Sequence, residues 1–454
     1  MWDALALAAR ELMLFAAVGL LIGGIDDLAL DALFLARRAG GRRGVRLAVA
    51  DLPASPPDRV AIFVPTWREE AVIGPMLRTL LARLEGRFTV YVATYADDRA
   101  TAAIVAAVAA HDDRVRPVRN PATGPTTKAD NLNRLWRAMR ADDARAGEPC
   151  RFVVLHDAED VVHRDELRVF AALIDRYDVI QLPVVPLRRR GVQLIAGTYG
   201  DTFAESHAKA MVVRAAIGAG MPLAGVGCAI ATEALAAVAA ARGGLAFDPS
   251  SLVEDYESGL RLAELDFRAA FVRFRGDHGL VAVGEYFPDT FGGAIRQKAR
   301  WMAGIALAGW DRTGWSRPGH LLDHWMRLRD RRALLAIVVL AAAYVSALLY
   351  GIVLVAQDVT GRAPRVGITP AAWLLGVNLS LLAWRMAMRV AFAWRAYGWR
   401  TALGAPLRFV VGNVIDLAAS PLALRRYVAT LRGAPPVWDK TAHDFPDLTP
   451  GVRS

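Results

Sequence analysis

RFVVLHDAED, residues 151–160, runs from a short apolar segment into three acidic residues. The apolar part predicts a buried β-strand, and the acidic part predicts the turn at its carboxyl end. Asp157 and Glu159 lie one residue apart there, so their carboxylates can share a hard divalent cation with phosphate oxygens. The alternative is an exposed acidic turn, completed by Asp160, that caps the helix after it. This motif alone leaves both interpretations open.

Comparable segments lie on both sides of this strand. Further strands are predicted by VAIFVPT from Val60, FTVYVATY from Phe88, DVIQLPVV from Asp178 and RAAFVRF from Arg268. Helical patterns lie between them, at residues 69–84, 101–110 and 129–139. This alternation predicts an α/β domain with a mainly parallel, doubly wound sheet, which we expect at residues 55–292. In such sheets the ligand binds at the carboxyl ends of the strands, where the polar motifs fall.

The composition favours a membrane protein with a soluble insert. Of the 454 residues 54% are apolar, and the excess lies in a few long runs. The formal charge of +10 would fit nucleic acid or an anionic membrane, and the arginine runs beside the apolar runs favour the membrane. We therefore expect no nucleic-acid partner. Cys150 and Cys228 have no metal-binding spacing, so we expect no disulfide framework and a reducing compartment.

The apolar runs predict a multi-pass arrangement. Residues 1–40 predict one spanning helix, and the basic cluster after it faces the cytoplasm by the positive-inside rule. That cluster consists of Arg42, Arg43 and Arg46, and the acidic residues that interrupt the helix are Asp26, Asp27 and Asp31. Residues 293–332 predict amphipathic interfacial helices. Residues 333–430 then hold two runs of spanning length, at 333–356 and 367–384.

A third apolar run, residues 403–424, ends at Arg425 and Arg426. A full crossing there would place these arginines outside, against the positive-inside rule. We therefore expect an interfacial or re-entrant helix at this run and a catalytic domain on the cytoplasmic side. Residues 431–454 are expected to form a C-terminal extension.

Two further motifs carry residues suited to sugar transfer. VEDYESG places Glu254 and Asp255 at the start of a predicted helix, where a carboxylate could take the proton from an acceptor hydroxyl. Acidic residues also favour helix N-termini for electrostatic reasons alone. In QKARW, Gln297 and Arg300 could hold a phosphate while Trp301 stacks on a sugar. The alternative is a helix whose basic side chains reach the membrane surface.

Weaker signals lie at other strand ends. Thr66 and Glu69 follow the first strand and could receive a base or ribose, or they could begin a helix as a capping box. Asp98 follows the second strand, in YADD. Lys128 begins a helix in TTKADNLN and could meet a nucleotide.

Other polar residues predict no chemistry of their own. In GTYGDTFAESHAK, the positions of Glu205, His207 and Lys209 predict a solvated helix face. His156 and His163 lack metal-ligand spacing with each other and with a third residue, so we expect no zinc site.

In this order the motifs resemble the inverting family-2 glycosyltransferases of the cellulose-synthase-like group, which have a GT-A fold. That family shows an acid after the second strand, then D-x-D, E-D and Q-x-x-R-W before a membrane span. Here they read Asp98, Asp157-Ala158-Glu159, Glu254-Asp255 and Gln297-Lys298-Ala299-Arg300-Trp301. The sequence around these motifs, from GPTTKADNLN to WDKTAHDFP, resembles one inner-membrane branch of the family that belongs to exopolysaccharide systems. The resemblance covers about residues 26–446.

The resemblance implies a site for a nucleotide-diphosphate sugar, expected to be a UDP-sugar with a hexosyl or N-acetylhexosaminyl group. Thr66, Glu69, Asp98 and Lys128 would line the nucleotide pocket. Asp157 and Glu159 would hold Mg²⁺ or Mn²⁺ on the diphosphate. Asp255 would be the general base, with Glu254 beside it. The pyrophosphate and the acceptor end would be held by Gln297, Arg300 and Trp301.

It further implies a GT-A-like domain inserted between transmembrane helices in the bacterial inner membrane. The enzyme would extend an exopolysaccharide with inversion, and its partners would be the donor, a saccharide acceptor and the bilayer. An export partner or a second copy of the chain would complete the path, because the spans are fewer than polymer-conducting synthases use. The alternatives are single addition to a lipid acceptor and a non-catalytic membrane scaffold or phage-receptor component. Glu159 departs from the family's usual second Asp.

Overall fold

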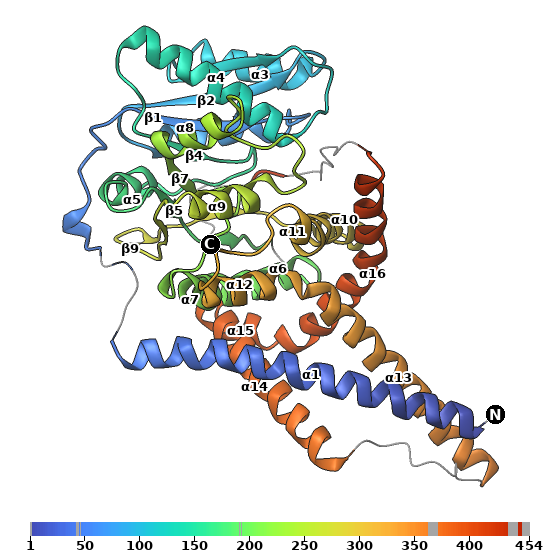
Figure 1. Cartoon of the computed structure of the whole chain (residues 1–454). Helices are drawn as coiled ribbons and strands as arrows, with labels where there is room; N and C mark the ends of the chain where they lie inside the picture. Colours follow the sequence, from blue (N-terminus) through green and yellow to red (C-terminus); the bar gives the residue numbers. More distant parts are fainter. Residues whose placement is uncertain are drawn as a thin grey trace.

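The computed structural model describes residues 2–41, 45, 47–189, 191, 193–361, 371–434 and 444–446. Its main sheet has seven strands in the order β3-β2-β1-β4-β7-β5-β8 (Figure 1). Strands β3, β2, β1 and β4 are parallel, whereas β7 is antiparallel to both of its neighbours, so the sheet is mixed. The strands are β1 (Val60–Pro65), β2 (Phe88–Tyr95), β3 (Val115–Asn120), β4 (Phe152–Leu155), β5 (Val179–Gln181), β7 (Cys228–Ala231) and β8 (Ala269–Phe271).

Burial on both faces explains why the strands read as continuous apolar runs. Every residue of β1 and β4 is buried, as expected for central strands covered by helices. The three helices predicted between the first strands are present, as α2 (Ile73–Arg83), α3 (Arg99–Ala109) and α4 (Lys128–Ala146). Side chains that follow strands start two of them. Asp98 accepts from the Thr101 amide at the start of α3, and Thr127 accepts from the Asp130 amide at the start of α4.

A smaller sheet lies beside the strand ends. Strand β6 (Val184–Pro186) pairs in parallel with β11 (Val283–Glu285), although a long stretch of sequence separates them. A bridge between Val161 and Gly284 joins this pair to the turn after β4. Glu285 is thereby brought close to the HDAED motif. The remaining strands form a hairpin, β9 (Arg275–Gly276) with β10 (Gly279–Leu280).

Further helices surround the sheet ends and connect them to the membrane part. They are η1 (Val49–Asp51), α5 (Glu166–Leu173), α6 (Ala196–Glu205), η2 (Ser206–Ala210), α7 (Met211–Ala216), α8 (Thr232–Ala241), α9 (Glu254–Glu264), α10 (Phe291–Trp301), η3 (Met302–Leu307), α11 (Ala308–Asp311), α12 (Leu321–Arg331) and α15 (Trp399–Ala402). Two of them, η2 and η3, are π-helical turns, which are rare and often lie at functional sites.

Within the described residues, four helices are long and apolar enough to cross a membrane, judged by length and composition. They are α1 (Trp2–Ala39), α13 (Ala333–Thr360), α14 (Ala372–Tyr397) and α16 (Ala405–Leu431). In Figure 1, α1, α13 and α14 extend away from the sheet, whereas α16 turns back towards it beside α10. Part of the run expected at residues 367–384 lies outside the described residues, as do Arg42, Arg43, Arg46 and most of the C-terminal extension.

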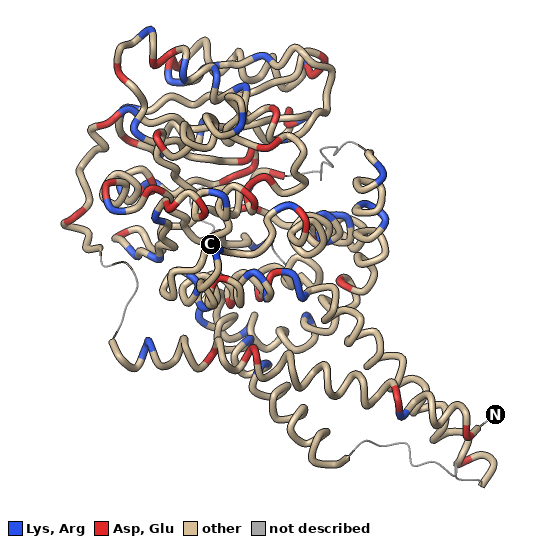
Figure 2. The backbone as a smooth tube through the Cα atoms, viewed as in Figure 1, with Lys and Arg blue, Asp and Glu red and all other residues tan. Residues whose placement is uncertain are grey.

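The aspartates that interrupt α1 have basic partners on other helices. Asp26 pairs with Arg329 of α12, Asp27 also pairs with Arg329 at 3.0 Å, and Asp31 lies 2.5 Å from Lys209 of η2. Figure 2 shows these charges gathered where α1 passes α12 and α14, while the projecting ends of the helices are mostly uncharged. A charge inside such a helix is costly unless it is paired, and these pairs meet that requirement.

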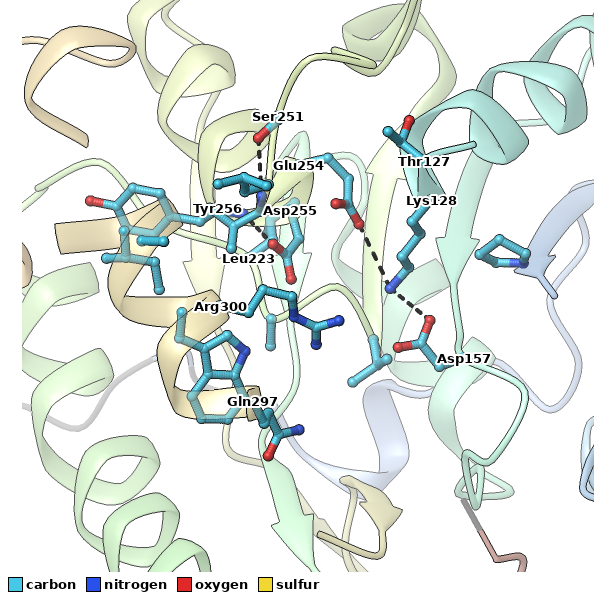
Figure 3. Close-up of a pocket in the computed structure, with 18 of the residues that line it drawn as sticks. Thr127, Lys128, Asp157, Leu223, Ser251, Glu254, Asp255, Tyr256, Gln297 and Arg300 are labelled. Atoms are coloured by element: carbon cyan, nitrogen blue, oxygen red, sulfur yellow. Dashed lines mark hydrogen bonds and ion pairs between the residues drawn. The ribbon is translucent and has the colours of Figure 1, made fainter. Parts of the chain in front are cut away.

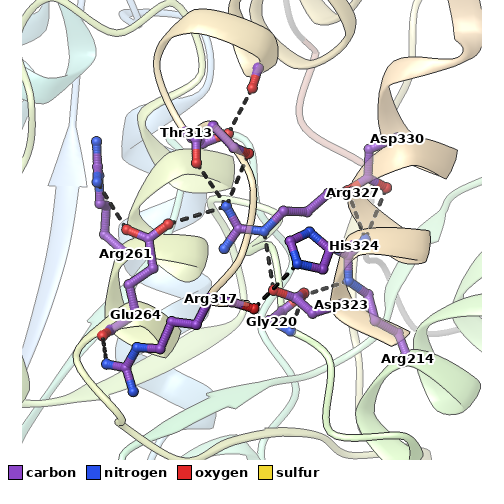
Figure 4. Close-up of polar contacts among 12 residues, drawn as sticks. Arg214, Gly220, Arg261, Glu264, Thr313, Arg317, Asp323, His324, Arg327 and Asp330 are labelled. Carbon is purple, nitrogen blue, oxygen red and sulfur yellow. Dashed lines mark hydrogen bonds and ion pairs between the residues drawn. The ribbon is translucent and has the colours of Figure 1, made fainter. Parts of the chain in front are cut away.

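Helix α12 links the base of the sheet domain to α1. Its Arg327 is fully buried and donates to the Thr313 carbonyl at 2.8 Å and to Glu264, the last residue of α9, at 3.1 Å (Figure 4). Asp330 on the same helix accepts from Arg214 at 2.8 Å and from the Tyr256 hydroxyl at 2.9 Å. These bonds fix both ends of α9 against α12, and therefore fix the residues at its start.

Candidate active site

A cavity of about 970 Å³ lies where β1 and β4 end. The starts of α4 and α9 and helix α10 form its walls (Figure 3), together with the last turns of α16, which contribute Arg426, Ala429 and Thr430. Most of the residues proposed from the sequence line this one cavity, although they come from five separate motifs. The lining includes Glu69, Lys128, Asp157, Glu159, Glu254, Asp255, Gln297, Arg300 and Trp301.

Lys128, the first residue of α4, lies between two of the acidic motifs. Its Nζ is 2.6 Å from Asp157 Oδ1 and 3.8 Å from Glu254 Oε1 (Figure 3). Burial alone would lower the pKa of this ammonium group, but the surrounding carboxylates of Asp157, Glu254 and Asp255 outweigh it and raise the pKa. Lys128 therefore stays charged, and it joins the HDAED motif to the VEDYESG motif.

Glu254 and Asp255 open α9 and face the cavity. Burial raises the pKa of Glu254 to about 7, against the opposing effect of Lys128. Burial also raises the pKa of Asp255, and Lys128 again opposes the shift. Gly225 makes room for Asp255, since a Cβ there would lie 2.5 Å from Asp255 Oδ2 and its φ is +78°. A buried carboxylate with a raised pKa is suited to accept a proton.

The HDAED motif divides into two parts with different tasks. Asp157 and Glu159 line the cavity. His156 is fully buried behind them, with Nδ1 2.8 Å from Asp160 and Nε2 2.7 Å from Glu166. Burial lowers the pKa of His156, but these two carboxylates outweigh it and raise the pKa to about 10. Asp160 thus supports the turn from behind, and because it is buried the alternative of an exposed acidic turn does not hold.

Helix α10 contributes the phosphate and acceptor candidates. Arg300 points into the cavity near Asp255 (Figure 3), and its charge, like that of Lys128, partly offsets the rise in the pKa of Asp255 that burial causes. Gln297 Oε1 is buried without a hydrogen-bond partner among the described residues. Trp301 belongs to an aromatic cluster with Tyr199 and Phe203, at ring distances of 5.9 and 6.3 Å. The QKARW motif therefore faces the cavity rather than only the membrane surface.

Two residues expected in the nucleotide pocket lie behind its wall. The Thr66 hydroxyl is fully buried and donates to the Ala93 carbonyl at 2.6 Å. Asp98 accepts from the amides of Thr101 and Arg68, the latter at 2.6 Å. Neither lines the cavity, whereas Trp67, Arg68 and Glu69 do. The structure thus gives Thr66 and Asp98 the task of holding the lining loop, and a direct contact with the nucleotide stays a prediction.

The acidic residues fit a divalent cation that is shared with a ligand. No group of three or more metal-binding side chains occurs within the described part of the chain, so the protein alone offers an incomplete cage. Carboxyl groups nevertheless gather here, since burial and the neighbouring carboxylates of Asp160, Glu159 and Asp157 raise the pKa of Glu285 well above its ordinary value. Asp157 and Glu159 offer hard oxygen ligands that a diphosphate could complete.

The cavity lining also contains residues that the sequence did not predict, and one helix face differs from its expected environment. Glu285 and His207 both line the cavity. The three residues expected on a solvated face are instead enclosed: Glu205 pairs with Lys209 at 2.6 Å, and His207 and Lys209 are 8% and 5% exposed. That expectation is wrong because the π-helical turn η2 and the cover supplied by α1 and α14 depend on tertiary packing. No local pattern predicts the place of Glu285, which depends on the pairing of β11 with β6.

Comparisons with known proteins agree with this geometry. The model of a family described as glycosyltransferase like family 2 matches residues 56–304. Bacteriophage adsorption protein B of Escherichia coli (strain K12) is 34% identical over 96% of this chain. Bacteriophage N4 adsorption protein B of Escherichia coli O157:H7 matches equally well. The chain spans 62% of the length of each of these relatives.

A solved structure has the same fold. It is the mannosyltransferase PcManGT from Pyrobaculum calidifontis in complex with GDP-Man and Mn²⁺. The TM-score is 0.51 at 17% identity, and the match covers 90% of this chain and 99% of that one. The GT-A-like mixed α/β sheet expected from the motif order is thereby confirmed, and so is the similarity to the adsorption protein B branch.

Proposed function

The chain belongs to the family-2 glycosyltransferases, and from that premise we propose that it moves a sugar from a nucleotide diphosphate onto a saccharide acceptor at this cavity. One observation carries the proposal. The D-x-D-like pair, the E-D pair and QKARW meet at one cavity, and Lys128 joins the first two. A non-catalytic scaffold would not require this convergence of carboxylates around a lysine.

We assign the chemistry to the chain's own groups as follows. Asp255 accepts the proton from the acceptor hydroxyl as its oxygen attacks the anomeric carbon from the face opposite the phosphate. The new C–O bond forms as the bond to the diphosphate breaks, so the configuration inverts. Arg300 and Gln297 hold the departing diphosphate. Lys128 keeps Asp157 in place and limits repulsion between the two acidic motifs. Mg²⁺ or Mn²⁺ held by Asp157 and Glu159 would neutralise charge on the diphosphate.

The apolar helices support a membrane location for this reaction. We propose that the chain is an inner-membrane protein whose cavity faces the cytoplasm, where nucleotide sugars are made. Helix α16 then starts and ends on that side, because Ala429 and Thr430 near its end line the cavity. The product is proposed to be an exopolysaccharide, as expected for the branch that the sequence resembles. With so few spans, an export partner or a second copy of the chain would complete the path for a polymer.

A donor screen tests the proposed function. Chain purified into lipid nanodiscs would be supplied with UDP-sugars and GDP-sugars and with Mn²⁺, and release of the nucleoside diphosphate would be followed. We expect one sugar to be consumed well above the others, and consumption to stop in chelator. Product size then separates a polymer from single addition to a lipid. If the folded chain consumes no donor in the panel, the proposal is wrong.

A further inference from the structure

His207 lies on η2, at the cavity wall, and has no role in the mechanism above. His207 is 8% exposed, and it is one of the residues that line the cavity. The ring packs against Phe203 at 4.8 Å and against Phe271 at 5.4 Å. Phe203 in turn belongs to the aromatic cluster around Trp301. His207 is therefore on the Trp301 side of the cavity, which is the side assigned to the acceptor.

One ring nitrogen of His207 is already used. The Val184 amide donates to Nδ1 at 2.9 Å, so Nδ1 must carry a lone pair and the ring proton must be on Nε2. Burial lowers the pKa of His207 to about 3, and the positive charge of Arg273 adds to the effect. Arg273 also donates to the His207 carbonyl at 3.1 Å. The imidazole is therefore neutral and held in one tautomer.

The second nitrogen, Nε2, belongs to a residue that lines the cavity, and it is not fully buried. No residue in the described part of the chain accepts a hydrogen bond from Nε2, and this atom is not among the fully buried polar atoms that lack a partner. A donor at the edge of an aromatic wall suits a sugar, whose faces stack on rings and whose oxygens accept hydrogen bonds. In the proposed mechanism Arg300 and Gln297 hold the diphosphate, which leaves His207 without a phosphate to bind.

We propose that His207 positions the acceptor sugar by donating its Nε2–H to an oxygen of that sugar beside Trp301. This inference rests on the proposed function, because it needs an acceptor at this end of the cavity. His207 is a binding residue and not a second base. Its only free nitrogen already carries a proton, so Asp255 keeps the task of accepting the proton from the acceptor.

Two amide substitutions separate this role from a purely structural one. The side-chain amide of His207→Gln reaches the position of Nε2 and can donate there, but it gives up the position of Nδ1. That of His207→Asn reaches the position of Nδ1 and can accept from Val184, but it stops short of the cavity. The proposal predicts that Gln preserves function, whereas a structural role predicts that Asn does.

The assay uses inverted membrane vesicles, which hold the chain with its own acceptor, and the radiolabelled donor found in the screen. The readouts are the ratio of transfer to donor hydrolysis and the KM for the donor. His207→Asn should lower the ratio by about three- to tenfold, the effect of one lost hydrogen bond, without changing the donor KM. His207→Gln should stay near the wild type. The reverse order of the two variants would overturn the proposal.

A measurement on the wild type keeps the inference testable if a variant fails to fold. Histidine ¹⁵N chemical shifts report which ring nitrogen carries the proton. We expect the Nε2–H tautomer for His207 across neutral pH, and an Nδ1–H tautomer or a charged ring would overturn the inference. If the wild type transfers no sugar, the proposed function itself fails and this inference fails with it. Transfer by the wild type with both variants at its level would overturn the inference alone.

Discussion

Lys128 is the residue on which the charge balance of the cavity depends. It is 14% exposed at its side chain and lies within ion-pair distance of carboxylates from two motifs. Without it Asp157, Glu254 and Asp255 would face one another across a poorly hydrated space, where like charges are costly. The pKa values of Glu254 and Asp255 are raised by burial and opposed by the charge of Lys128, so they depend on the assembled cavity.

Glu254 should make the metal-free protein less stable as the pH rises. Its pKa is raised from 4.5 to about 7, chiefly by burial, so the folded chain binds a proton that the unfolded chain has already lost within this window. The free energy of unfolding therefore falls as the pH rises through it, by about 1 to 3 kcal/mol. Thermal unfolding in detergent from pH 4.5 to pH 8 would measure this loss.

The Glu254→Gln variant should lose less stability over the same pH range. Glu233→Gln changes an exposed glutamate on α8 and is the matched control, which should follow the wild type. A Glu254→Gln curve parallel to that of the wild type would show that Glu254 does not carry the effect.

At this scale the sequence predicted the lining residues that lie at strand or helix ends. Asp157, Glu159, Lys128, Glu254 and Asp255 all follow a strand or start a helix, so local pattern was sufficient. Thr66 and Asp98 also follow strands, but their side-chain oxygens form hydrogen bonds with nearby main-chain groups instead of lining the cavity. Glu285 could not be found in this way. Its position results from the pairing of β11 with β6, which cannot be predicted from a local sequence pattern.

Among the elements, the loop before β7 sets the position of Asp255. Gly225→Ala combines a strained φ of +78° with a Cβ only 2.5 Å from Asp255 Oδ2. The strain costs about 1 to 2 kcal/mol, and the carboxylate must also move. We expect transfer to fall by at least about tenfold, because small displacements of a reacting group are costly. Steady-state transfer with the screened donor would measure this.

Gly243→Ala is the control for that experiment. Gly243 has a φ of +61° but nothing within 4 Å of the added Cβ, so it carries the backbone strain without the contact. It should lose stability and keep its turnover per folded molecule. Equal loss of turnover in the two variants would show that strain alone, rather than the position of Asp255, explains the effect.

The contact of α1 with η2 should contribute measurably to stability. Asp31 is 2% exposed and pairs with Lys209 at 2.5 Å, and it also accepts from the Trp384 indole at 2.9 Å. Asp31→Asn removes the charge from a buried pair, which typically lowers the free energy of unfolding by about 3 to 5 kcal/mol. Lys209 keeps Glu205 as a second carboxylate partner, so we expect a loss near the lower limit. The thermal midpoint in detergent would register it.

Glu11→Gln is the matched control on the same helix, because its partner Arg10 and Glu11 itself are largely exposed. Its effect should be under about 1 kcal/mol. Equal shifts in the two variants would mean that the buried pair adds nothing. The sequence predicted α1 from its apolar content, but the partners of its aspartates lie on α12, η2 and α14 and could not be inferred locally.

For the whole molecule, the cavity and the membrane helices together predict a topology. A cysteine introduced at Gly41, after α1, and one at Gly433, after α16, should both be labelled from the cytoplasmic side. One at Gly361, after α13, should be labelled from outside. Gly433 lies three residues after Thr430, which lines the cavity. It should therefore be on the same side of the membrane as the catalytic residues. Impermeant maleimide applied to intact cells and to inverted vesicles would read this out.

Labelling of the Gly433 position only from outside would make α16 a full crossing and would contradict the assigned topology. The sequence predicted that this helix does not cross the membrane. That prediction rested on charge alone, because Arg425 and Arg426 end the apolar run. The structure adds a reason that the sequence could not supply: the end of this helix forms a wall of the cavity.

The central claim is that this cavity transfers sugar with Asp255 as the base. It is tested most directly by the anomeric configuration and rate of transfer, followed by NMR with the screened donor and Mn²⁺, for the wild type and for Asp255→Asn. The account predicts an inverted product, and a fall in rate of about two to four powers of ten in the variant with donor binding unchanged. A retained configuration, or near-normal transfer by Asp255→Asn, would contradict it.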